Sequence, residues 1–163
     1  DHMEFDWMLA VKAAIAAALG AFSAFWGWLG WLVAAWVVLM ALDYITGTAA
    51  AMKNGEWASQ TAREGIWHKA GEVVVVIIAA FADFLLSIVM EQLPMVEITL
   101  PEIGLLLPLV LVWYAITELG SIAENAQRMG APIPAWLVKL MANGKEAVDA
   151  AGDKLTGGGD SQE

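Results

Sequence analysis

The stretch that decides the fold begins Ile66-Trp67-His68-Lys69-Ala70-Gly71-Glu72 and continues as VVVVIIAAFADFLLSIVM over residues 73–90. Asp83 is the only charged residue in that apolar run. The run approaches the roughly 20 residues that a helix needs to cross the hydrocarbon core of a bilayer. It therefore predicts a membrane-spanning helix over about 66–90, in preference to a buried helix of a soluble protein.

A stripe of polar residues and small spacers runs along this helix at steps of three or four, which places it on one side. The stripe consists of His68, Glu72, Val76, Ala79 or Ala80, Asp83, Ser87 and Glu91. The rest of the surface is apolar and suits lipid, while the stripe suits protein or water. Two roles for Asp83 stay open: it faces water when subunits assemble, or it hydrogen-bonds to another helix. Lys69 and Glu72 are interpreted as interfacial residues whose long side chains reach the headgroups.

The composition agrees with a membrane protein. Hydrophobic residues make up 60% of the chain, against roughly 45–50% in soluble domains. The nine tryptophans suit anchoring at a bilayer interface. No cysteine is present, so disulfides and thiol chemistry are excluded. The net charge of −10 argues against nucleic acid as a partner, because binding phosphates requires a basic surface.

The N-terminal region is uncharged over a length greater than one bilayer crossing. Residues 1–5 look like a cloning remnant, and no charged residue occurs between Ala13 and Leu42. We expect an amphipathic or membrane-embedded helix over about 7–25, followed by a crossing helix over about 28–47. A tight hairpin with two crossings, which gives four transmembrane helices, is the alternative. Small residues at three- and four-residue steps are the candidates for close helix packing: Gly20, Ser23, Gly27 and Gly30.

A third apolar helix is expected over about 103–126, so that residues 6–130 form an all-α membrane domain. Pro132 and Pro134 break the chain after it. Residues 131–151 then read as an amphipathic helix of the kind that lies on a membrane surface. The glycine-rich and polar tail at 152–163 is expected to be disordered.

The basic residues predict the orientation. Apart from Lys12, they occur in the connection at 43–72 and in the C-terminal part, whereas the connection at 91–102 holds none. The positive-inside rule places the first two regions in the cytoplasm. We therefore expect a multi-pass protein of the bacterial cytoplasmic membrane with a cytoplasmic C-terminus.

The sequence predicts no catalytic, cofactor-binding or metal site. His68 has no second His or Cys with which to build a metal site. The serines lack a partnered His and acid, and the glycines do not form a phosphate-binding loop. Because nothing matches a catalytic motif, we do not expect an enzyme.

Two motifs in a defined order resemble a known family. Leu42-Asp43-Tyr44-Ile45-Thr46-Gly47 ends one apolar helix, and Gly65-x-x-x-Lys69 leads into the next. The third apolar helix ends in Ile116-Thr117-Glu118-Leu119-Gly120-Ser121-Ile122-Ala123-Glu124-Asn125, followed by Gly130-Ala131-Pro132-Ile133-Pro134. This order, over residues 31–142, resembles the phage holin family that includes toxin-secretion holins.

The resemblance implies a protein that forms homo-oligomers in the bilayer and opens a lesion or pore. Its functional partner would be an endolysin, or a secreted toxin or protein, released for host lysis. The candidates for assembly or for facing a pore are Asp43, Tyr44, Thr46, Gly47, Glu72, Asp83, Ser87, Glu118, Ser121, Glu124 and Asn125. A small ion channel or transporter subunit, with Asp83 and Glu118 as relay acids, is the alternative. A membrane anchor whose C-terminal helix recruits a partner is a third possibility.

Overall fold

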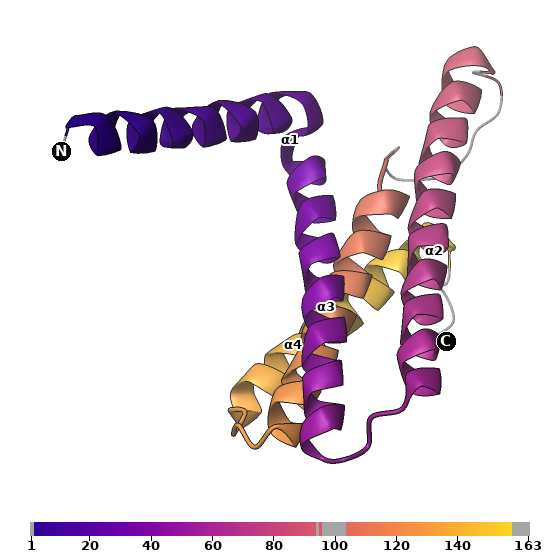
Figure 1. Cartoon of the computed structure of the whole chain (residues 1–163). Coiled ribbons are helices and arrows are strands. Elements are labelled where there is room, and N and C mark those ends of the chain that lie inside the picture. Colours follow the sequence, from indigo (N-terminus) through magenta and orange to yellow (C-terminus); the bar gives the residue numbers. More distant parts are fainter. Residues whose placement is uncertain (1, 94, 96–103, 158–163) are drawn as a thin grey trace.

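The computed structural model describes residues 2–93, 95 and 104–157 of the chain. Within those residues the fold is all-helical, with α1 (His2–Lys53), α2 (Ser59–Gln92), α3 (Leu106–Arg128) and α4 (Ala135–Leu155) (Figure 1). Three segments are long and apolar enough to cross a membrane, and they are Gly27–Lys53, Ser59–Gln92 and Leu106–Arg128. The predicted all-α membrane fold with three spanning helices is confirmed.

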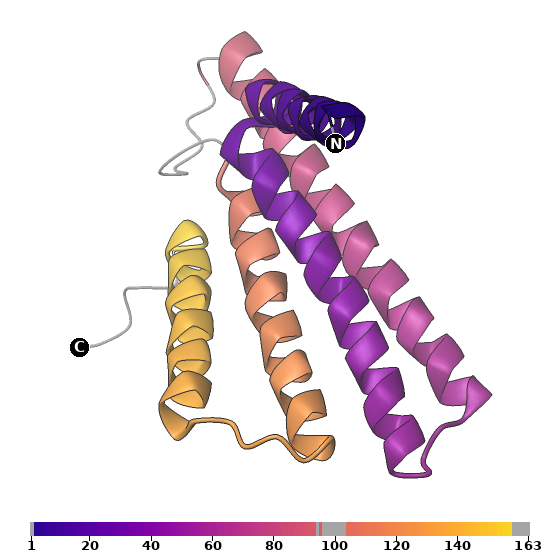
Figure 2. The same cartoon turned by 60° about the vertical axis from the view of Figure 1, so that its left-hand side comes forward.

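Helix α1 is two helices joined at a sharp break. Gly27 has φ 60° and ψ −154°, a backbone conformation that is open essentially to glycine alone. The arm before it contains the short apolar helix Trp7–Ala21 and projects sideways from the other helices (Figures 1 and 2). A short N-terminal helix followed by a crossing helix is therefore confirmed. The alternative of a tight hairpin does not fit, because the first arm does not fold back along the second.

Several helices extend beyond their predicted limits. α1 continues to Lys53 instead of ending near residue 47, because Ala49-Ala50-Ala51 are strong helix formers. α2 begins at Ser59 instead of residue 66. Its first turns hold a hydrogen bond from Gln60 Nε2 to Glu64 Oε1 at 3.0 Å, a favourable i,i+4 pair.

The C-terminal helix also differs from its prediction. It begins at Ala135 and continues to Leu155, so residues 152–155 are helical and not disordered. Leu155 is partly buried, as are Val148 and Ala151 at the preceding three- and four-residue steps, so the apolar side of α4 continues to its last residue. The predicted disorder at 158–163, and most of the predicted connection at 91–102, lie outside the described residues.

Helix α3 is the centre of the bundle. It contacts α1, α2 and α4, whereas α1 and α2 touch each other little. The buried core combines Trp36 of α1, Val76 of α2 and Leu111 of α3. The rings of Trp36 and Tyr114 also lie 6.3 Å apart between their centroids. The three spanning helices are thus held together chiefly through α3.

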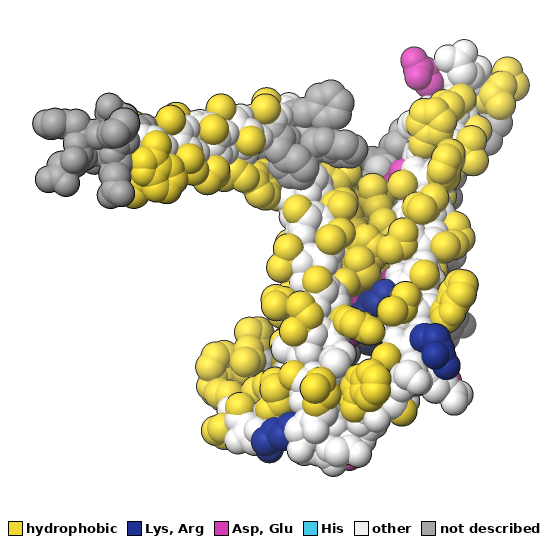
Figure 3. Space-filling view, viewed as in Figure 1, with side chains coloured by type: hydrophobic (Ala, Val, Ile, Leu, Met, Phe, Trp, Pro, Cys, Tyr) yellow, Lys and Arg dark blue, Asp and Glu magenta, His cyan; other side chains and the backbone are white. Residues whose placement is uncertain are grey.

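The outer surface of α1 and α2 is apolar. Large hydrophobic side chains are exposed along both helices, as the space-filling view shows (Figure 3). On α2 they include Val74, Ile77, Ile78, Phe81, Phe84 and Leu85. An exposed apolar surface of this extent marks a contact with lipid or protein, and the spanning length of the helices indicates lipid.

Candidate functional site: a polar network inside the helix bundle

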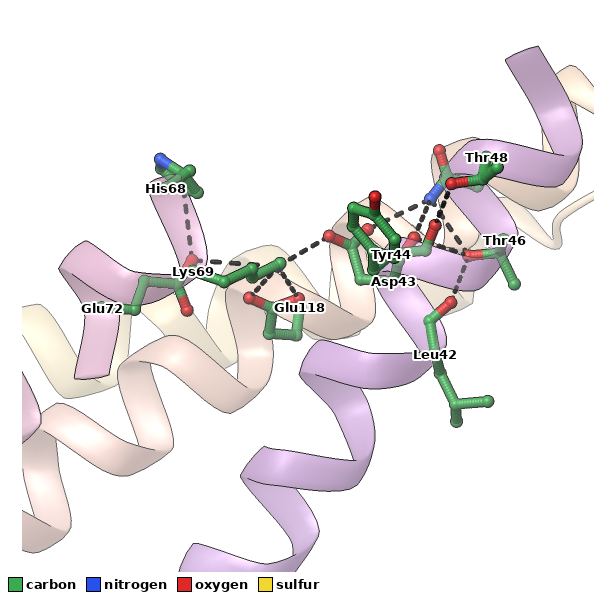
Figure 4. A network of polar contacts seen from close by, with 10 residues as sticks. Leu42, Asp43, Tyr44, Thr46, Thr48, His68, Lys69, Glu72 and Glu118 are labelled. Carbon is green, nitrogen blue, oxygen red and sulfur yellow. Dashed lines mark hydrogen bonds and ion pairs between the residues drawn. The ribbon is translucent and has the colours of Figure 1, made fainter. Parts of the chain in front are cut away.

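Lys69 joins the three spanning helices through ion pairs. It projects from α2 into the bundle, where its Nζ lies 2.7 Å from Asp43 Oδ2 of α1 and pairs with both carboxylate oxygens of Glu118 of α3 (Figure 4). The Lys69 side chain is 18% exposed and that of Glu118 is 1% exposed. Each spanning helix therefore contributes one charged residue to a single buried junction.

Acidic groups outnumber basic groups around this junction. Glu72, one turn after Lys69 on α2, has an oxygen 3.8 Å from Lys69 Nζ and 3.2 Å from His68 Nε2. Its other oxygen, Oε2, is buried without a hydrogen-bond partner among the described residues. A buried charge costs several kcal/mol and is offset only by close pairing. The position of Lys69 between Asp43 and Glu118 is therefore the feature that stabilises the buried acids.

Asn125 extends the network along α1 and α3. Its Nδ2 donates to the backbone oxygen and the Oδ1 of Asp43, at 3.2 and 3.1 Å, and lies 3.1 Å from Thr46 Oγ1. A Cβ added to Gly47 would lie 3.4 Å from that same Nδ2. The two sequence motifs, at 42–47 and 116–125, are therefore in direct contact across the α1–α3 interface.

A cavity of about 640 Å³ opens beside the network, between the end of α1, the start of α2 and the end of α3. Among its lining residues are Asp43, Tyr44, His68, Lys69, Ser121 and Glu124. The Tyr44 hydroxyl donates to the carbonyl of Ala62 at 3.5 Å. In the described part of the chain, no group of three or more His, Cys, Asp or Glu side chains is placed to hold a metal ion.

Asp83 lies away from this network and contacts the start of α3. Its two carboxylate oxygens accept hydrogen bonds from the backbone nitrogens of Leu106, at 3.1 Å, and Leu107, at 2.8 Å. Helix α3 has no side-chain cap from its own N-cap residue. An anion is favoured at a helix N-terminus, where free N–H groups and the helix dipole meet it. In the single subunit Asp83 is thus hydrogen-bonded to another helix, and a role for Asp83 in assembly stays a prediction.

The remaining predicted site residues behave differently. Ser87 donates to the carbonyl of Phe84 in its own helix at 2.7 Å. Two of the predicted packing residues of the N-terminal region have no close neighbours from other helices of the subunit. A Cβ added to Gly20 would have no atom within 4 Å, and Ser23 is exposed. Gly27 forms the break, and Gly30 is buried. A packing role for this seam between subunits stays a prediction.

The interpretation of Lys69 and Glu72 as interfacial residues is wrong. Both side chains turn inward, and Glu72 is only 4% exposed. One signal could have indicated this: each spanning helix carries an acid, and a charged residue in a membrane segment usually pairs with another. Lys69 is the basic residue that lies within reach of those acids.

These features define a class: a multi-pass helical membrane protein with an apolar exterior and a polar network that is closed within one subunit. The chain belongs to the bacteriophage holin family, whose model matches residues 20–146. A protein of Halalkalibacterium halodurans, described as uncharacterized, is 34% identical over 136 residues, which cover 83% of this chain and 90% of that protein. No solved structure matches the chain significantly. The resemblance drawn from the two motifs is confirmed, and both motifs lie inside the matched region.

Proposed function

We propose that this protein assembles in the bacterial cytoplasmic membrane into a lesion that releases an endolysin, or a secreted toxin or protein, and so causes host lysis. Membership of the bacteriophage holin family supports this function. Three apolar helices of spanning length support residence in the bilayer. The proposal makes the protein a pore-forming homo-oligomer and not an enzyme.

The observation that carries the proposal is the closure of the polar network within one subunit. Lys69 pairs with both Asp43 and Glu118 inside the bundle, while large apolar side chains cover the exteriors of α1 and α2. An unpaired charge facing lipid costs roughly 2.5–3.5 kcal/mol on insertion scales. Single subunits can therefore accumulate in the membrane without exposing ionised groups, as a protein that acts only after accumulation requires.

The orientation is part of the proposal. Lys53 and Arg63 lie at the ends of the helices that flank the α1–α2 connection, and the C-terminal part holds four further basic residues. The positive-inside rule favours a cytoplasmic position for both regions. In the resting membrane we place α4 at the cytoplasmic surface, where an amphipathic helix satisfies both of its sides.

The channel alternative requires Asp83 and Glu118 to pass protons. Asp83 accepts two backbone hydrogen bonds from α3, and Glu118 is paired with Lys69. Both acids thus have partners that give them structural roles. These contacts favour the holin function over a proton relay.

A lysis assay in cells that also express a paired endolysin tests the proposal. The wild-type protein should cause an abrupt collapse of membrane potential together with enzyme release. Asp83→Leu should change the timing of lysis, because it removes the contact with α3, but should not abolish release. Cells that keep their potential while the endolysin stays trapped would overturn the proposal. A graded proton flux that is lost in Asp83→Leu, without enzyme release, would favour the channel.

A further inference from the structure

Helix α4 packs along the membrane-crossing part of α3. The Trp113 indole nitrogen donates to Asp149 Oδ1 at 2.8 Å, and Lys145 Nζ lies 4.2 Å from the centroid of the Trp113 ring. A Cβ on Gly144 would lie 3.3 Å from Ile116 Cδ1. Trp113 and Ile116 lie in the interior of α3, far from the Arg128 end at which the chain turns toward α4. The docked α4 therefore lies beside the segment of α3 that is long and apolar enough to cross a membrane (Figure 2).

The length of α4 matches this position. Its 21 residues extend about 30 Å at about 1.5 Å per residue, which equals the thickness of a typical hydrocarbon core. It runs back along α3 after the turn at 129–134. A docked α4 would thus line the same thickness of membrane that α3 crosses.

The outward side of α4 does not suit lipid. A row of residues at three- and four-residue steps is exposed along α4, and it consists of Lys139, Asn143, Glu146, Ala150 and Asp153. The large apolar side chains that α4 exposes, Trp136, Val138 and Leu140, are confined to its first two turns. Glu146 lies near the middle of the helix, where its short side chain reaches neither interface. A charge at that depth costs roughly 2.5–3.5 kcal/mol in lipid. The docked position is therefore stable only if water covers this side.

The flank of the subunit formed by α2 is apolar, in contrast to the charged side of α4. In the described residues α4 contacts α3 and no other helix, while α2 lies across the bundle from it (Figure 2). The exposed side of α2 is apolar over residues 73–90, with Ile78, Phe81 and Phe84 more than half exposed. The polar stripe of α2 cannot supply a water-facing wall, because Glu72 is buried and Asp83 is bonded to α3. One subunit thus presents a lipid flank and a water flank.

From these observations we infer that α4 forms the wall of the lesion, with its Lys139–Asp153 side facing a water-filled lumen. The inference rests on the proposed function, since one α4 cannot enclose water and several copies must complete the ring. The resting subunit keeps α4 at the cytoplasmic surface. Assembly supplies the water that makes the docked position favourable, and so shifts the population toward it. The wall carries both signs of charge, which suits passage of a folded protein without strong charge selection.

A reversible cross-link between α3 and α4 tests this inference in vesicles that hold the purified full chain and a protein-sized fluorescent cargo. The natural sequence has no cysteine, so Ile116→Cys/Gly144→Cys can be joined by a short reducible bis-thiosulfonate. Trp113→Cys/Asp149→Cys provides a second, independent lock, in case the first pair disturbs folding. The four single-cysteine proteins are the matched controls.

If α4 lines the lumen, both locked proteins should release cargo as the wild type does. A bulky polymer maleimide at Asn143→Cys should then reduce cargo release at least tenfold, whereas the same group at Ile78→Cys on α2 should not. Locked proteins that retain cargo and recover on reduction would overturn the inference, as would release that is insensitive to the group at position 143. Wild-type protein that releases no cargo would instead overturn the proposed function, and the lumen wall with it.

Discussion

Asn125 of α3 donates its side-chain amide to both the backbone oxygen and the carboxylate of Asp43 of α1, at 3.2 and 3.1 Å. The Asp43 carboxylate also forms an ion pair with Lys69 of α2, with 2.7 Å between Lys69 Nζ and Asp43 Oδ2. Two motifs that are far apart in the sequence therefore meet at one three-helix junction. The junction provides the polar contacts that hold α1, α2 and α3 together inside an apolar exterior.

Removing the basic residue of the junction should destabilise the bundle. Lys69→Met leaves the buried carboxylate of Glu118 and the half-buried carboxylate of Asp43 without a counter-charge, and removing one partner of a buried pair costs about 3–5 kcal/mol. Equilibrium unfolding in detergent, followed by tryptophan fluorescence, measures the loss. Lys139→Met on the exposed side of α4 is the control and should change the free energy by less than about 0.5 kcal/mol. Equal effects of the two substitutions would contradict a stabilising role for Lys69.

The stability of the α1–α3 contact should depend on the size of the side chain at position 47. A Cβ there would lie 3.4 Å from Asn125 Nδ2, which is an ordinary contact distance. We therefore expect Gly47→Ala to be tolerated. Gly47→Leu should overpack the interface and cost about 1–3 kcal/mol. Thermal unfolding in the same detergent compares the two, and a Gly47→Leu protein as stable as Gly47→Ala would show that the helices do not approach closely.

Loss of the Asp83 carboxylate should loosen the start of α3. Asp83→Leu removes both acceptors for the backbone N–H groups of Leu106 and Leu107, and loss of a helix cap costs about 0.5–2 kcal/mol. Hydrogen exchange by mass spectrometry should show faster exchange at these two amides, while the middle of α3 is unchanged. Ser87→Ala is the control, because that hydroxyl bonds only within α2. Unchanged exchange at the amides of Leu106 and Leu107 in Asp83→Leu would contradict a capping role for Asp83.

The break in α1 should depend on Gly27. Alanine at φ 60° and ψ −154° costs about 1–3 kcal/mol, so Gly27→Ala should straighten α1 and move the N-terminal arm. Spin labels on cysteines at Ile15 and Trp57 report the change as a shift in the distance distribution. Gly20→Ala lies in the same arm with open space around it and should leave the distance unchanged. Identical distributions in the two variants would place the bend elsewhere.

Much of the fold could be predicted because hydropathy reports the environment of a segment. The apolar run at 73–90 is too long and too hydrophobic for another assignment. Helix ends were predicted less well. Residues 48–53 stay helical because they include three alanines, and the polar residues at 59–65 stay helical with support from the Gln60–Glu64 hydrogen bond. Hydropathy carries no information on either cause.

The partners of the polar residues could not be predicted in the same way. Periodicity placed Glu72 and Asp83 on one side of a helix, but it does not say which helix covers that side. The inward turn of Lys69 follows from acids on two other helices, at positions 43 and 118, that only the folded bundle brings near it. Likewise, an amphipathic pattern at 135–155 fits both a membrane surface and the side of α3, where Trp113 and Ile116 receive it.

The size of the cargo that escapes from vesicles tests the central claim most directly. Purified full-length protein is reconstituted at increasing protein-to-lipid ratios into vesicles that hold a small dye and a protein-sized fluorophore. We expect no release at low ratios, and release of both cargoes together above a threshold, because the lesion forms only by assembly of many subunits. Escape of the small dye alone at every ratio, in proportion to the amount of protein, would contradict a self-assembled lesion and indicate an ion-conducting subunit.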